Sequence, residues 1–458
     1  MKRFVVILFS FIGTLYSQNL VKIGSTSVTI DTLISGMDVP WELIYGPDEH
    51  LWVTERKGIV SRIDPILKTK TVILDLTDTV HAVAESGMLG MAMHPDFPAT
   101  PQVFLVYDYQ SGTDVKVRLS RFDYINSMLV HEVVLIDGIV GGNAHNGSRL
   151  LFLPDKTLLM TTGDGDVAGV PQNKGALNGK VLRVNTDGSI PADNPFPGKY
   201  IYTFGHRNSQ GMCYGPNGKI YISEHGTTTD DEFQQLEAGR NYGWPDVQGY
   251  CDLPSESAFC TANNVKEPIL DWTPTIAPAG IIFYTNNNFP EFDNSFLLTT
   301  LKTKKLVAIK LNAAGTASVS QTSYLENMFG RLRDVCYGKQ GEVYLATNGP
   351  EAWNTEPGTH SILVIRTPLP GSVKRIGADQ QVLLYPTAVT DKLTIETASV
   401  SNLEIGIYSL LGVSVFSKSI QQASASVLSL EELAAGVYVV DVRSGDSVLA
   451  KKKIVVTR

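Results

Sequence analysis

The stretch PDEHLWVTE at residues 47–55 sets a pattern that recurs along this chain and decides its fold. A Pro-Asp turn comes first, an alternating apolar run of strand composition follows, and a small or acidic residue ends it. Clear copies read PDKTLLMTT at 154–162, PNGKIYISE at 216–224 and QGEVYLATN at 340–348. The copies are one or two steps of roughly 50 to 60 residues apart, which indicates a repeated β unit.

Weaker copies fill the gaps, near residues 95–106 and 289–298. Six units of strand and turn, with hardly any helical period, predict an all-β chain folded as a six-bladed β-propeller. An array of β-sandwich domains is the alternative architecture. A propeller directs loops from every blade to one axial opening, so a site there would draw residues from distant parts of the sequence.

The composition changes near residue 376. Beyond it the chain has no Trp or His, and short Val/Ile/Leu runs alternate with Ser, Asp and Gly. About 80 residues are enough for a small β-sandwich. The sequence therefore predicts a signal peptide at 1–18, a propeller at 19–370, a linker at 371–380 and a C-terminal β-sandwich at 381–458.

The N-terminus has the three parts of a secretory signal. Lys2 and Arg3 supply positive charge, residues 4–15 are apolar, and Ser17 and Gln18 are small or polar. The apolar run is too short to span a bilayer comfortably. We expect export, with the protein secreted or at the cell surface and without a stable membrane span. A buried first strand is the alternative.

Four cysteines are present, and none forms a CxxC pair. Export permits disulfides. Cys251 and Cys260 bracket a loop of eight residues and are predicted to be bridged. Cys213 and Cys336 lie in strand-like runs and are predicted to be buried thiols.

Two Gly-rich turns carry the candidate catalytic side chains. His145 lies in GGNAHNGSR at 141–149, where it is free of core packing and could act as a general base. A loop histidine that caps backbone groups is the alternative. Arg207 lies in GHRNSQG at 205–211, where it could stabilise developing negative charge. A structural arginine paired with a carboxylate is the alternative there.

Two further loops stand out. The turn EHGTTTDDE at 224–232 clusters carboxylates and exposed carbonyls that suit a hard cation such as Ca²⁺. Its spacing is not that of an EF-hand, and a solvated acidic loop is the alternative. The loop WTPTIAPAG at 272–280 is rigid and polar, and taken alone it is more simply a connector stiffened by proline.

The formal net charge of −8 argues against nucleic acid as a partner, because phosphate binding needs a positive face. Positive charge is nevertheless concentrated at Lys302, Arg331 and Arg333. The i, i+2 spacing of the two arginines puts both on one face of an extended segment. With Arg207 they would form a pocket for a small, multiply charged anion. Scattered surface charges are the alternative.

The region 32–368 contains several short motifs. They are VPW at 39–41, TER at 54–56, GMLG at 87–90, HPDF at 94–97, GKVLRV at 179–184, DGSIPADNPF at 187–196, GHRN at 205–208 and NYGWP at 241–245. In this order and spacing, they make the region resemble the soluble quinoprotein glucose dehydrogenase and aldose sugar dehydrogenase family. Members of that family are six-bladed propellers that hold pyrroloquinoline quinone (PQQ) with Ca²⁺ and oxidise aldoses to lactones. The resemblance implies the same for this chain, with an electron acceptor that the sequence does not identify.

The resemblance also implies roles for single residues. His145 would remove the proton of the anomeric hydroxyl during hydride transfer to the quinone, and Arg207 would polarise the quinone carbonyl. The carbonyls of Gly226 and Thr227 would bind the cofactor's Ca²⁺. Other cofactor contacts would be Glu85, Asn208, Thr275, Lys302, Arg331 and Arg333. Ligands of a second, structural Ca²⁺ would be Asp231, Glu232 and Tyr242.

The chain departs from that family's pattern beside the candidate base. The residue before His145 is Ala144, where glucose-specific members have Asp, and this favours a broader range of aldoses. The turn at 227–229 is Thr-Thr-Thr in place of a Pro-containing one, a change that carbonyl ligation tolerates.

Two rival functions remain at this point. A Ca²⁺-dependent propeller hydrolase such as a lactonase would not need the cluster of Lys302, Arg331 and Arg333. A propeller that binds glycans or partners without catalysis would not need His145 and Arg207 to converge. The fold alone cannot choose between them.

The C-terminal segment resembles the sorting domain of type IX secretion. Its marks are LYPT at 384–387, YSLLG at 408–412, LAAGVY at 433–438 and the basic end KKKIVV at 451–456. The resemblance implies transport across an outer membrane by a secretion machinery that recognises this domain. A carbohydrate-binding sandwich is the alternative.

Overall fold

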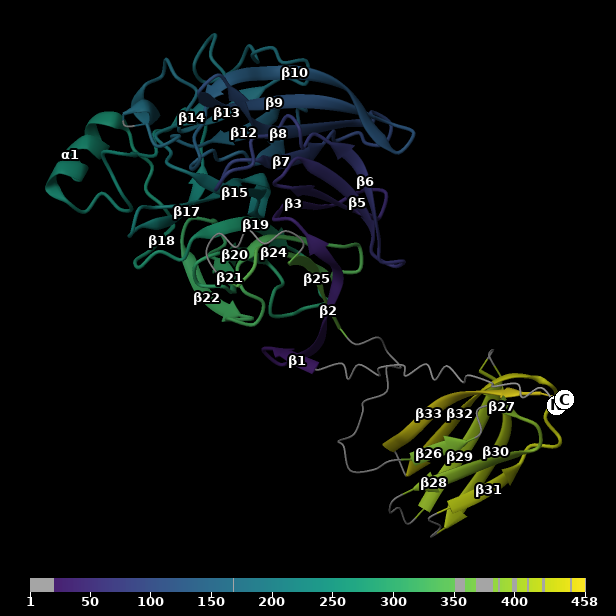
Figure 1. The fold of residues 1–458 in the computed structure, drawn as a ribbon. Coiled ribbons are helices and arrows are strands. Elements are labelled where there is room, and N and C mark those ends of the chain that lie inside the picture. The colour runs from purple at the N-terminus through teal and green to yellow at the C-terminus, as the bar shows by residue number, and fades with distance from the viewer. Residues whose placement is uncertain are drawn as a thin grey trace. The chain divides into compact units, whose positions relative to one another are not determined.

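The computed structural model describes most of the chain. It covers residues 20–167, 169–350 and 359–367, and residues 382–457 apart from breaks at 386–387, 398–401, 410–411, 422–424 and 445–446. The predicted signal peptide at 1–18 and the predicted linker at 371–380 lie outside the described residues. The chain divides into two compact units, residues 1–367 and 368–458, and each is described by itself (Figure 1).

The described strands of the first unit form six sheets. Five of them have four strands each: β3 (Pro40–Tyr45), β4 (Leu51–Glu55), β5 (Ile59–Asp64) and β6 (Thr69–Asp75); β7 (Met88–Met93), β8 (Gln102–Ser111), β9 (Asp114–Ile125) and β10 (Met128–Val140); β11 (Leu150–Phe152), β12 (Leu158–Thr162), β13 (Lys180–Val184) and β14 (Ile201–Phe204); β15 (Ser209–Tyr214), β16 (Ile220–Glu224), β17 (Asp231–Leu236) and β18 (Leu270–Trp272); β19 (Pro278–Tyr284), β20 (Ser295–Thr300), β21 (Leu306–Leu311) and β22 (Ser318–Tyr324). Figure 1 shows the first strands near a common centre and the fourth strands at the periphery.

The sixth sheet joins both ends of the first unit. Its strand order is β1 (Leu20–Ile23), β2 (Thr26–Met37), β25 (His360–Arg366), β24 (Val343–Thr347) and β23 (Leu332–Tyr337). The early strand β2 pairs antiparallel with the late strand β25, with Ile34 opposite Ile362. The side chain of Glu291 holds the β1–β2 turn, since it accepts hydrogen bonds from Ser25 and Thr26. The sheet is therefore completed only by distant parts of the sequence.

Each clear copy of the sequence pattern forms the strand next to an edge strand of its sheet: β4 beside β3, β12 beside β11, β16 beside β15 and β24 beside β23. These strands are apolar on both faces because sheets pack on both sides of them. In β12, Met160 packs in a cluster with Phe104 of one neighbouring sheet, while Leu159 packs in another cluster with Ile222 of the other. The prediction of an all-β chain is confirmed.

Helical structure is sparse among the described residues. It comprises the 3₁₀ turns η1 (Val170–Gln172) and η2 (Pro216–Gly218) and the helix α1 (Pro254–Asn263). Pro254 starts α1 at a position where its missing N–H costs nothing, and Asn264 ends it in a left-handed conformation. None of these elements is long and apolar enough to cross a membrane.

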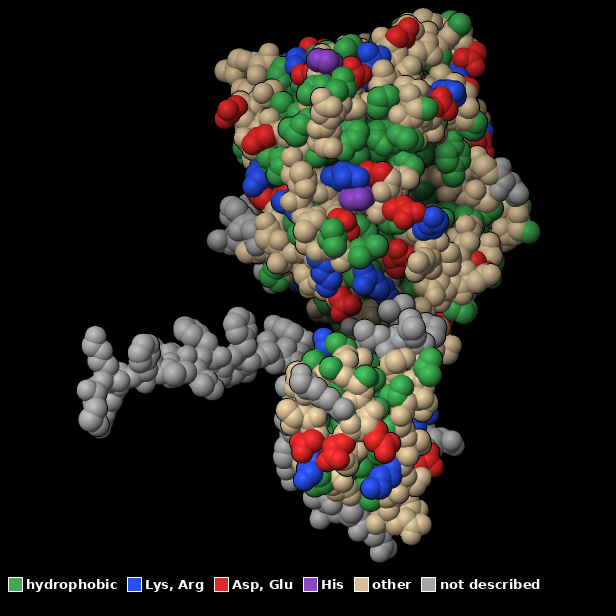
Figure 2. All heavy atoms as spheres, turned by 90° about the vertical axis from the view of Figure 1, so that its right-hand side faces the viewer, with side chains coloured by type: hydrophobic (Ala, Val, Ile, Leu, Met, Phe, Trp, Pro, Cys, Tyr) green, Lys and Arg blue, Asp and Glu red, His purple; other side chains and the backbone are tan. Residues whose placement is uncertain are grey.

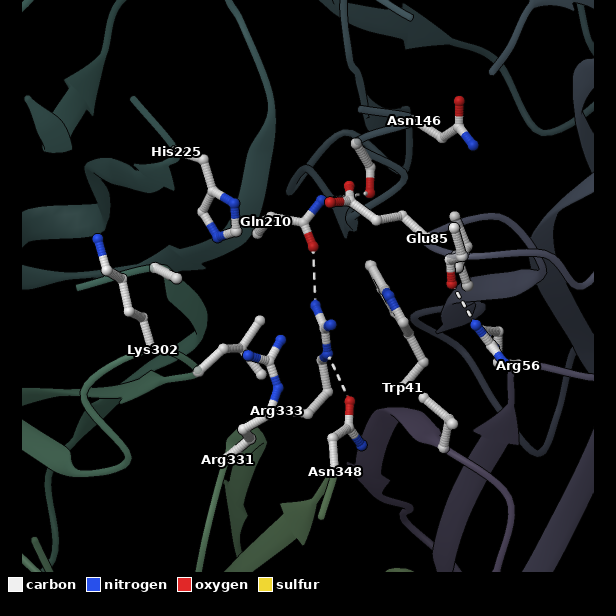
Figure 3. Close-up of a pocket in the computed structure, with 16 residues that line it drawn as sticks. Trp41, Arg56, Glu85, Asn146, Gln210, His225, Lys302, Arg331, Arg333 and Asn348 are labelled. Carbon is white, nitrogen blue, oxygen red and sulfur yellow. Dashed lines mark hydrogen bonds between the residues drawn. The ribbon is translucent and has the colours of Figure 1, made fainter. Parts of the chain in front are cut away.

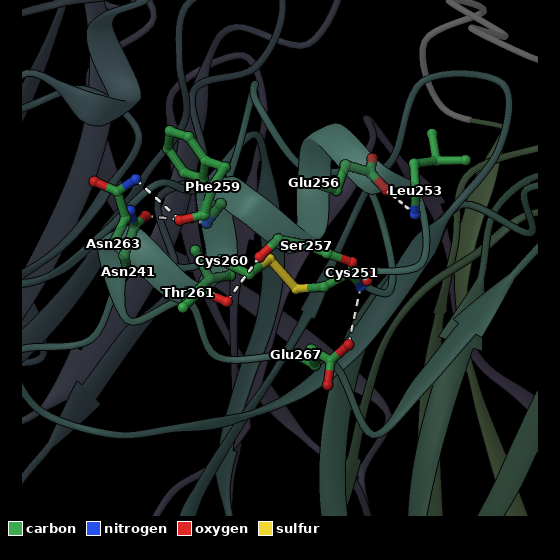
Figure 4. Close-up of a disulfide and its surroundings, with 12 residues drawn as sticks. Asn241, Cys251, Leu253, Glu256, Ser257, Phe259, Cys260, Thr261, Asn263 and Glu267 are labelled. Atoms are coloured by element: carbon green, nitrogen blue, oxygen red, sulfur yellow. Dashed lines mark hydrogen bonds between the residues drawn. A yellow bond between two sulfur atoms is a disulfide. The ribbon is translucent and has the colours of Figure 1, made fainter.

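The cysteine predictions are confirmed. Cys251 and Cys260 form a disulfide that links the second half of α1 to the segment before the helix (Figure 4). Cys213 and Cys336 are buried free thiols, and burial raises the pKa of both.

The second unit contains two sheets. One has the order β26 (Val382–Tyr385), β28 (Lys392–Thr397) and β31 (Ala425–Ser429); the other has the order β27 (Ala388–Val389), β33 (Ser447–Val456), β32 (Gly436–Ser444), β29 (Asn402–Ser409) and β30 (Ser414–Gln421). Leu393 and Ile395 of the first sheet share a core with Ile405 and Val440 of the second. The unit thus has a hydrophobic core of its own.

The surface of the first unit carries charges of both signs. Figure 2 shows Lys and Arg side chains interspersed with Asp and Glu on the face that it presents, with apolar side chains between them. Interspersed charge of this kind leaves no broad positive area on that face.

Candidate active site

A cavity of about 380 Å³ opens among loops of the first unit. It is lined by residues from all six sheets or the loops beside them (Figure 3). The lining residues are Val39, Trp41, Arg56, Ala84, Glu85, Leu89, Asn146, Gly147, Gln210, His225, Ala277, Leu301, Lys302, Arg331, Arg333 and Asn348. The predicted contacts Glu85, Lys302, Arg331 and Arg333 therefore share one cavity.

The cavity is strongly cationic. Burial lowers the pKa of Arg333 to about 9, and repulsion from Arg331 and Arg149 adds to the effect. Burial also lowers the pKa of Arg331 and of Arg56. Such shifts mean that positive charge is crowded together out of water, where a negative partner is favourable.

Hydrogen bonds hold Arg333 in place. Its Nε donates to Asn348 Oδ1 at 3.0 Å, and its Nη1 donates to Gln210 Oε1 at 2.9 Å. The centre of the Trp41 ring lies 5.8 Å from the central carbon of this guanidinium and 4.2 Å from that of Arg149. The wall of the cavity therefore combines a flat aromatic surface with fixed positive charge.

Lys302 and Thr275 were both predicted as cofactor contacts. Lys302 Nζ donates to Thr275 Oγ1 at 2.5 Å. Lys302 lines the cavity. Thr275 does not line it, but its hydroxyl accepts the hydrogen bond from the Lys302 ammonium group. The loop that looked like a simple connector thus positions a cavity lysine.

Glu85 joins the cavity to the candidate base. Its Oε2 accepts the backbone N–H of His145 at 3.0 Å and the side-chain N–H of Asn208 at 3.3 Å. Asn208 Oδ1 also accepts the N–H of Gly147 at 3.2 Å. The predicted contacts Glu85 and Asn208 are therefore placed on either side of the His145 loop.

His145 is held in a constrained conformation. Its φ is 57°, which is uncommon for a residue with a Cβ and concentrates at functional sites. A side-chain carbon at Gly163 would lie 1.7 Å from the His145 carbonyl oxygen, so only glycine permits this approach of the two loops. The His145 side chain is 12% exposed, and its neighbours Asn146 and Gly147 line the cavity.

Two carboxylates flank the imidazole. His145 Nδ1 lies 2.8 Å from Asp164 Oδ1 and 3.1 Å from Asp166 Oδ1. Asp164 is buried, and its Oδ2 accepts the indole N–H of Trp244 at 2.9 Å. Asp166 is 71% exposed. The buried carboxylate therefore fixes the ring orientation, which leaves Nε2 as the nitrogen available for chemistry.

Arg207 lies beside the cavity rather than in its lining. Its backbone N–H donates to Glu224 Oε1 at 2.6 Å, and its Nη1 donates to the carbonyls of His225 and Gly226. Gly226 O is one of the carbonyls predicted for the cofactor's Ca²⁺. In this structure, the Arg207 guanidinium donates a hydrogen bond to a carbonyl oxygen that the resemblance assigns as a Ca²⁺ ligand.

His225 separates Arg207 from the cavity and lines it. Its Nε2 is buried and has no hydrogen-bond partner among the described residues. Burial lowers the pKa of His225 to about 3, with repulsion from Arg333 and Arg207 contributing. The imidazole is consequently neutral, and its Nε2 is an unsatisfied buried polar atom in a residue that lines the cavity.

A small void of about 10 Å³ lies on the other side of Arg207. Its lining includes Glu224, Asp230, Glu232 and Tyr242. Burial raises the pKa of Glu232 well above its usual range, and the nearby Glu224 carboxylate raises it further. Acidic groups thus crowd this void as cations crowd the larger cavity.

The other residues predicted as Ca²⁺ ligands, Asp231 and Tyr242 for the structural ion and Thr227 for the cofactor's ion, are arranged differently. Both oxygens of Asp231 accept backbone N–H groups, from Gly226, Ile276 and Ala277, and Asp231 does not line the void. The Tyr242 hydroxyl donates to the Gln235 carbonyl. Thr227 is exposed and contacts Gln248. Of the predicted carboxylates, Glu232 alone faces the void.

Sequence reasoning did not single out every residue of the site. Asp164 follows strand β12 in a Gly-Asp-Gly-Asp turn, and that acidic turn after a buried strand was an available signal. Trp41, Arg56 and Trp244 stood inside motifs quoted for the resemblance but had no assigned role. Gln210, His225 and Asn348 gave no signal of their own, because only the fold brings them together.

Comparison with known proteins assigns both parts of the chain to families. Residues 37–353 match the Glucose / Sorbosone dehydrogenase family, and residues 383–457 match the Secretion system C-terminal sorting domain. The chain belongs to the glucose/sorbosone dehydrogenase family and ends in a sorting domain of that kind. The sorting domain indicates export to the cell surface or beyond.

Three relatives illustrate the likeness. Quinoprotein glucose dehydrogenase B of Acinetobacter calcoaceticus is 34% identical, over 69% of this chain and 84% of its own. Aldose sugar dehydrogenase YliI of Escherichia coli is 28% identical, over 70% of this chain and 90% of its own. The structure of the PQQ-bound aldose sugar dehydrogenase of Streptomyces coelicolor superposes with a TM-score of 0.64 at 29% identity, covering 74% of this chain and 98% of its own.

Proposed function

We propose that the first unit is a six-bladed propeller that oxidises aldose sugars to lactones with PQQ and Ca²⁺. One observation carries the proposal. Lys302, Arg331 and Arg333 line one cavity, on the opposite side from Glu85 and Asn146 of the His145 loop (Figure 3). The loop that carries the carboxylate-held imidazole thus adjoins a cationic receptor, an arrangement that supports sugar oxidation by an acidic cofactor.

The lining fits a planar, acidic quinone. PQQ carries three carboxylates, and Lys302, Arg331 and Arg333 are the groups that would hold them. The Trp41 ring offers a flat wall, and His225 Nε2 offers a polar atom that has no described partner. Glu85 and Asn208 would complete the contacts through the His145 loop, and Thr275 would act by orienting Lys302.

The base is His145. Its Nδ1 faces Asp164, so Nε2 would take the proton of the anomeric hydroxyl. The Asp164 carboxylate stabilises the imidazolium that forms. The hydrogen bound to the anomeric carbon then leaves as hydride, which completes the oxidation of a cyclic aldose to a lactone. The quinone, when bound, supplies the oxidising power for that hydride.

Calcium beside the cofactor would use the carbonyls of Gly226 and Thr227. Gly226 O now accepts from Arg207 Nη1, so a bound cation would compete with the guanidinium for this oxygen. Arg207 displaced in this way would keep its backbone hydrogen bond to Glu224 and could stabilise negative charge in the cavity.

A second cation would occupy the acidic void beside Tyr242. Glu224, Asp230 and Glu232 line it, and a hard divalent ion would relieve their mutual repulsion. Asp231 would contribute by holding the backbone around Gly226 with its carboxylate rather than by ligating the ion. The structural role proposed for this ion is to fix the turn at 226–231.

The substrate range is proposed to be broad, because Ala144 offers no carboxylate beside the base.

The proposed segments are a signal peptide at 1–18, a propeller at 19–370, a linker at 371–380 and a β-sandwich of the type IX sorting kind at 381–458. The electron acceptor would be met outside the cell or at its surface.

The decisive experiment measures dye reduction. Purified protein is mixed with PQQ and Ca²⁺, and aldoses are added with an artificial electron acceptor. We expect sugar-dependent reduction and lactone as product. Lactone hydrolysis in the absence of PQQ would favour a hydrolase instead. Glycan binding without turnover would favour a non-catalytic propeller.

Two variants probe the assigned roles. His145→Ala should lower kcat by about 10² to 10⁴ while PQQ still binds, because only the base is lost. Lys302→Ala should weaken PQQ binding, measured by titration of the quinone absorption band. Lys219→Ala is the matched control, since Lys219 is remote from the cavity and donates only to the Ala314 carbonyl. Equal PQQ affinity in the Lys302→Ala and Lys219→Ala variants would contradict the proposal that Lys302 helps to hold PQQ.

A further inference from the structure

Trp244 lies between the two halves of the site. It is half-buried in the loop that follows Tyr242, and it lines the small acidic void beside Arg207. Its backbone is fixed at both ends, because its N–H donates to the Gly205 carbonyl and its carbonyl accepts from Gln172 Nε2. The indole is therefore presented in a definite place.

The indole edge contacts the partner of the base. Trp244 Nε1 donates to Asp164 Oδ2 at 2.9 Å, while Asp164 Oδ1 faces His145 Nδ1 at 2.8 Å. The backbone N–H of Asp166 also donates to Oδ1, at 2.9 Å. Trp244 is thus the described side chain that engages Oδ2, and it prevents the carboxylate from rotating away from the imidazole.

The indole face contacts the other catalytic side chain. The Arg207 guanidinium carbon lies 5.3 Å from the centre of the Trp244 ring, a cation–π distance. The two halves also meet through the backbone, since the Asp164 N–H donates to the Arg207 carbonyl at 2.8 Å. One residue therefore touches both the group that holds the base and the group that stabilises charge.

We propose that Trp244 is a positioning residue that sets the His145–Asp164 pair with its N–H and the Arg207 guanidinium with its ring. The inference rests on the proposed function. It predicts that the two contacts can be separated, because phenylalanine keeps a ring and loses the donor, whereas leucine loses both.

The test compares Trp244→Phe and Trp244→Leu with the wild-type holoenzyme. Trp244→Phe should lower kcat about tenfold, with PQQ affinity unchanged and the pH profile of kcat/KM displaced, because the base loses its orientation. Trp244→Leu should lower kcat further, since Arg207 loses its platform as well. The control is Trp272→Phe, which removes an indole N–H of β18 that donates to Gln321 in β22 and should change neither property.

A measurement on the apoprotein keeps the inference independent of turnover. The Trp244 indole N–H resonance in ¹⁵N-labelled protein should shift on Asp164→Asn, and the Trp272 resonance should not. An unshifted Trp244 signal, or a folded Trp244→Phe variant with wild-type kcat and pH profile, would overturn the inference. A wild-type protein that reduces no dye with any aldose would instead count against the proposed function, while the resonance test would still report on the contact.

Discussion

At the scale of single residues, the site depends on glycines that let loops approach one another. His145 adopts a left-handed φ, and its carbonyl lies against Gly163 with no room for a side chain. The loop carrying His145, the proposed base, and the turn carrying Asp164 are thereby locked together. This explains how a Gly-rich turn can hold the imidazole in one position.

Gly163→Ala should disrupt this arrangement. A Cβ there would lie 1.7 Å from the His145 carbonyl oxygen, so the base loop must move. We expect kcat to fall at least tenfold and the thermal midpoint to drop. Gly198→Ala is the control, because Gly198 has a positive φ but nothing within 4 Å, so it should cost only about 1 kcal/mol of backbone strain and leave kcat unchanged. Full activity in Gly163→Ala would contradict the packing of these loops.

At the scale of elements, a disulfide cross-links the α1 segment, and the Glu291 side chain holds the β1–β2 hairpin by hydrogen bonds. The disulfide between Cys251 and Cys260 holds α1 beside residues that contact the acidic void. The Gly249 N–H donates to Glu232 Oε1 at 2.9 Å, and Gln248 lines the void. The cross-link therefore bears on the proposed cation site as well as on the helix.

Replacing both Cys251 and Cys260 by Ser should show this link. Loss of a short cross-linked loop costs about 2–3 kcal/mol by chain entropy. We also expect weaker Ca²⁺ binding, measured by calorimetry, because the segment with Gly249 is no longer held beside Glu232. A double variant that is less stable yet binds Ca²⁺ with wild-type affinity would confine the disulfide to α1.

The β1–β2 hairpin should respond to pH through Glu291. Burial would raise the pKa of this carboxyl, yet hydrogen bonds from Thr26 and Ser25 outweigh it and lower the pKa to about 2. A depressed pKa contributes stability that is present above the ordinary value of 4.5 and is lost as the pH falls towards 2. Glu291→Gln should therefore destabilise the protein at pH 7 and less so near pH 3, measured by denaturant unfolding. A deficit that does not change with pH would rule out this carboxylate as the source.

At the scale of the whole molecule, both units are separately cored, and the cavity belongs entirely to the first. The clear sequence copies located β4, β12, β16 and β24, because burial on both faces makes the first three residues of each strand apolar. Lys302, Arg331 and Arg333 were recognisable because isolated cations in an acidic chain stand out. Asp164 and Trp244 had no assigned role, since their contact arises only when two loops from different sheets meet.

A chain that stops after Thr367 should keep sugar oxidation. All lining residues of the cavity lie before this point, as does every strand of the six sheets. We expect kcat for dye reduction within about twofold of the full chain, by analogy with separable domains. Export to the cell surface should be lost, measured by fractionation of cells. A truncated chain that folds but does not turn over would assign the second unit a part in catalysis.

The pairing of β2 with β25 has a consequence for the order of assembly. The strand that leaves the ribosome among the first can find its partner only after residues 360–366 have been made. Until then the last sheet lacks its outer strands, and closing so large a loop is slow. The sixth sheet of the nascent chain should therefore stay incomplete through most of synthesis, and β2 should pair with β25 in a single late step.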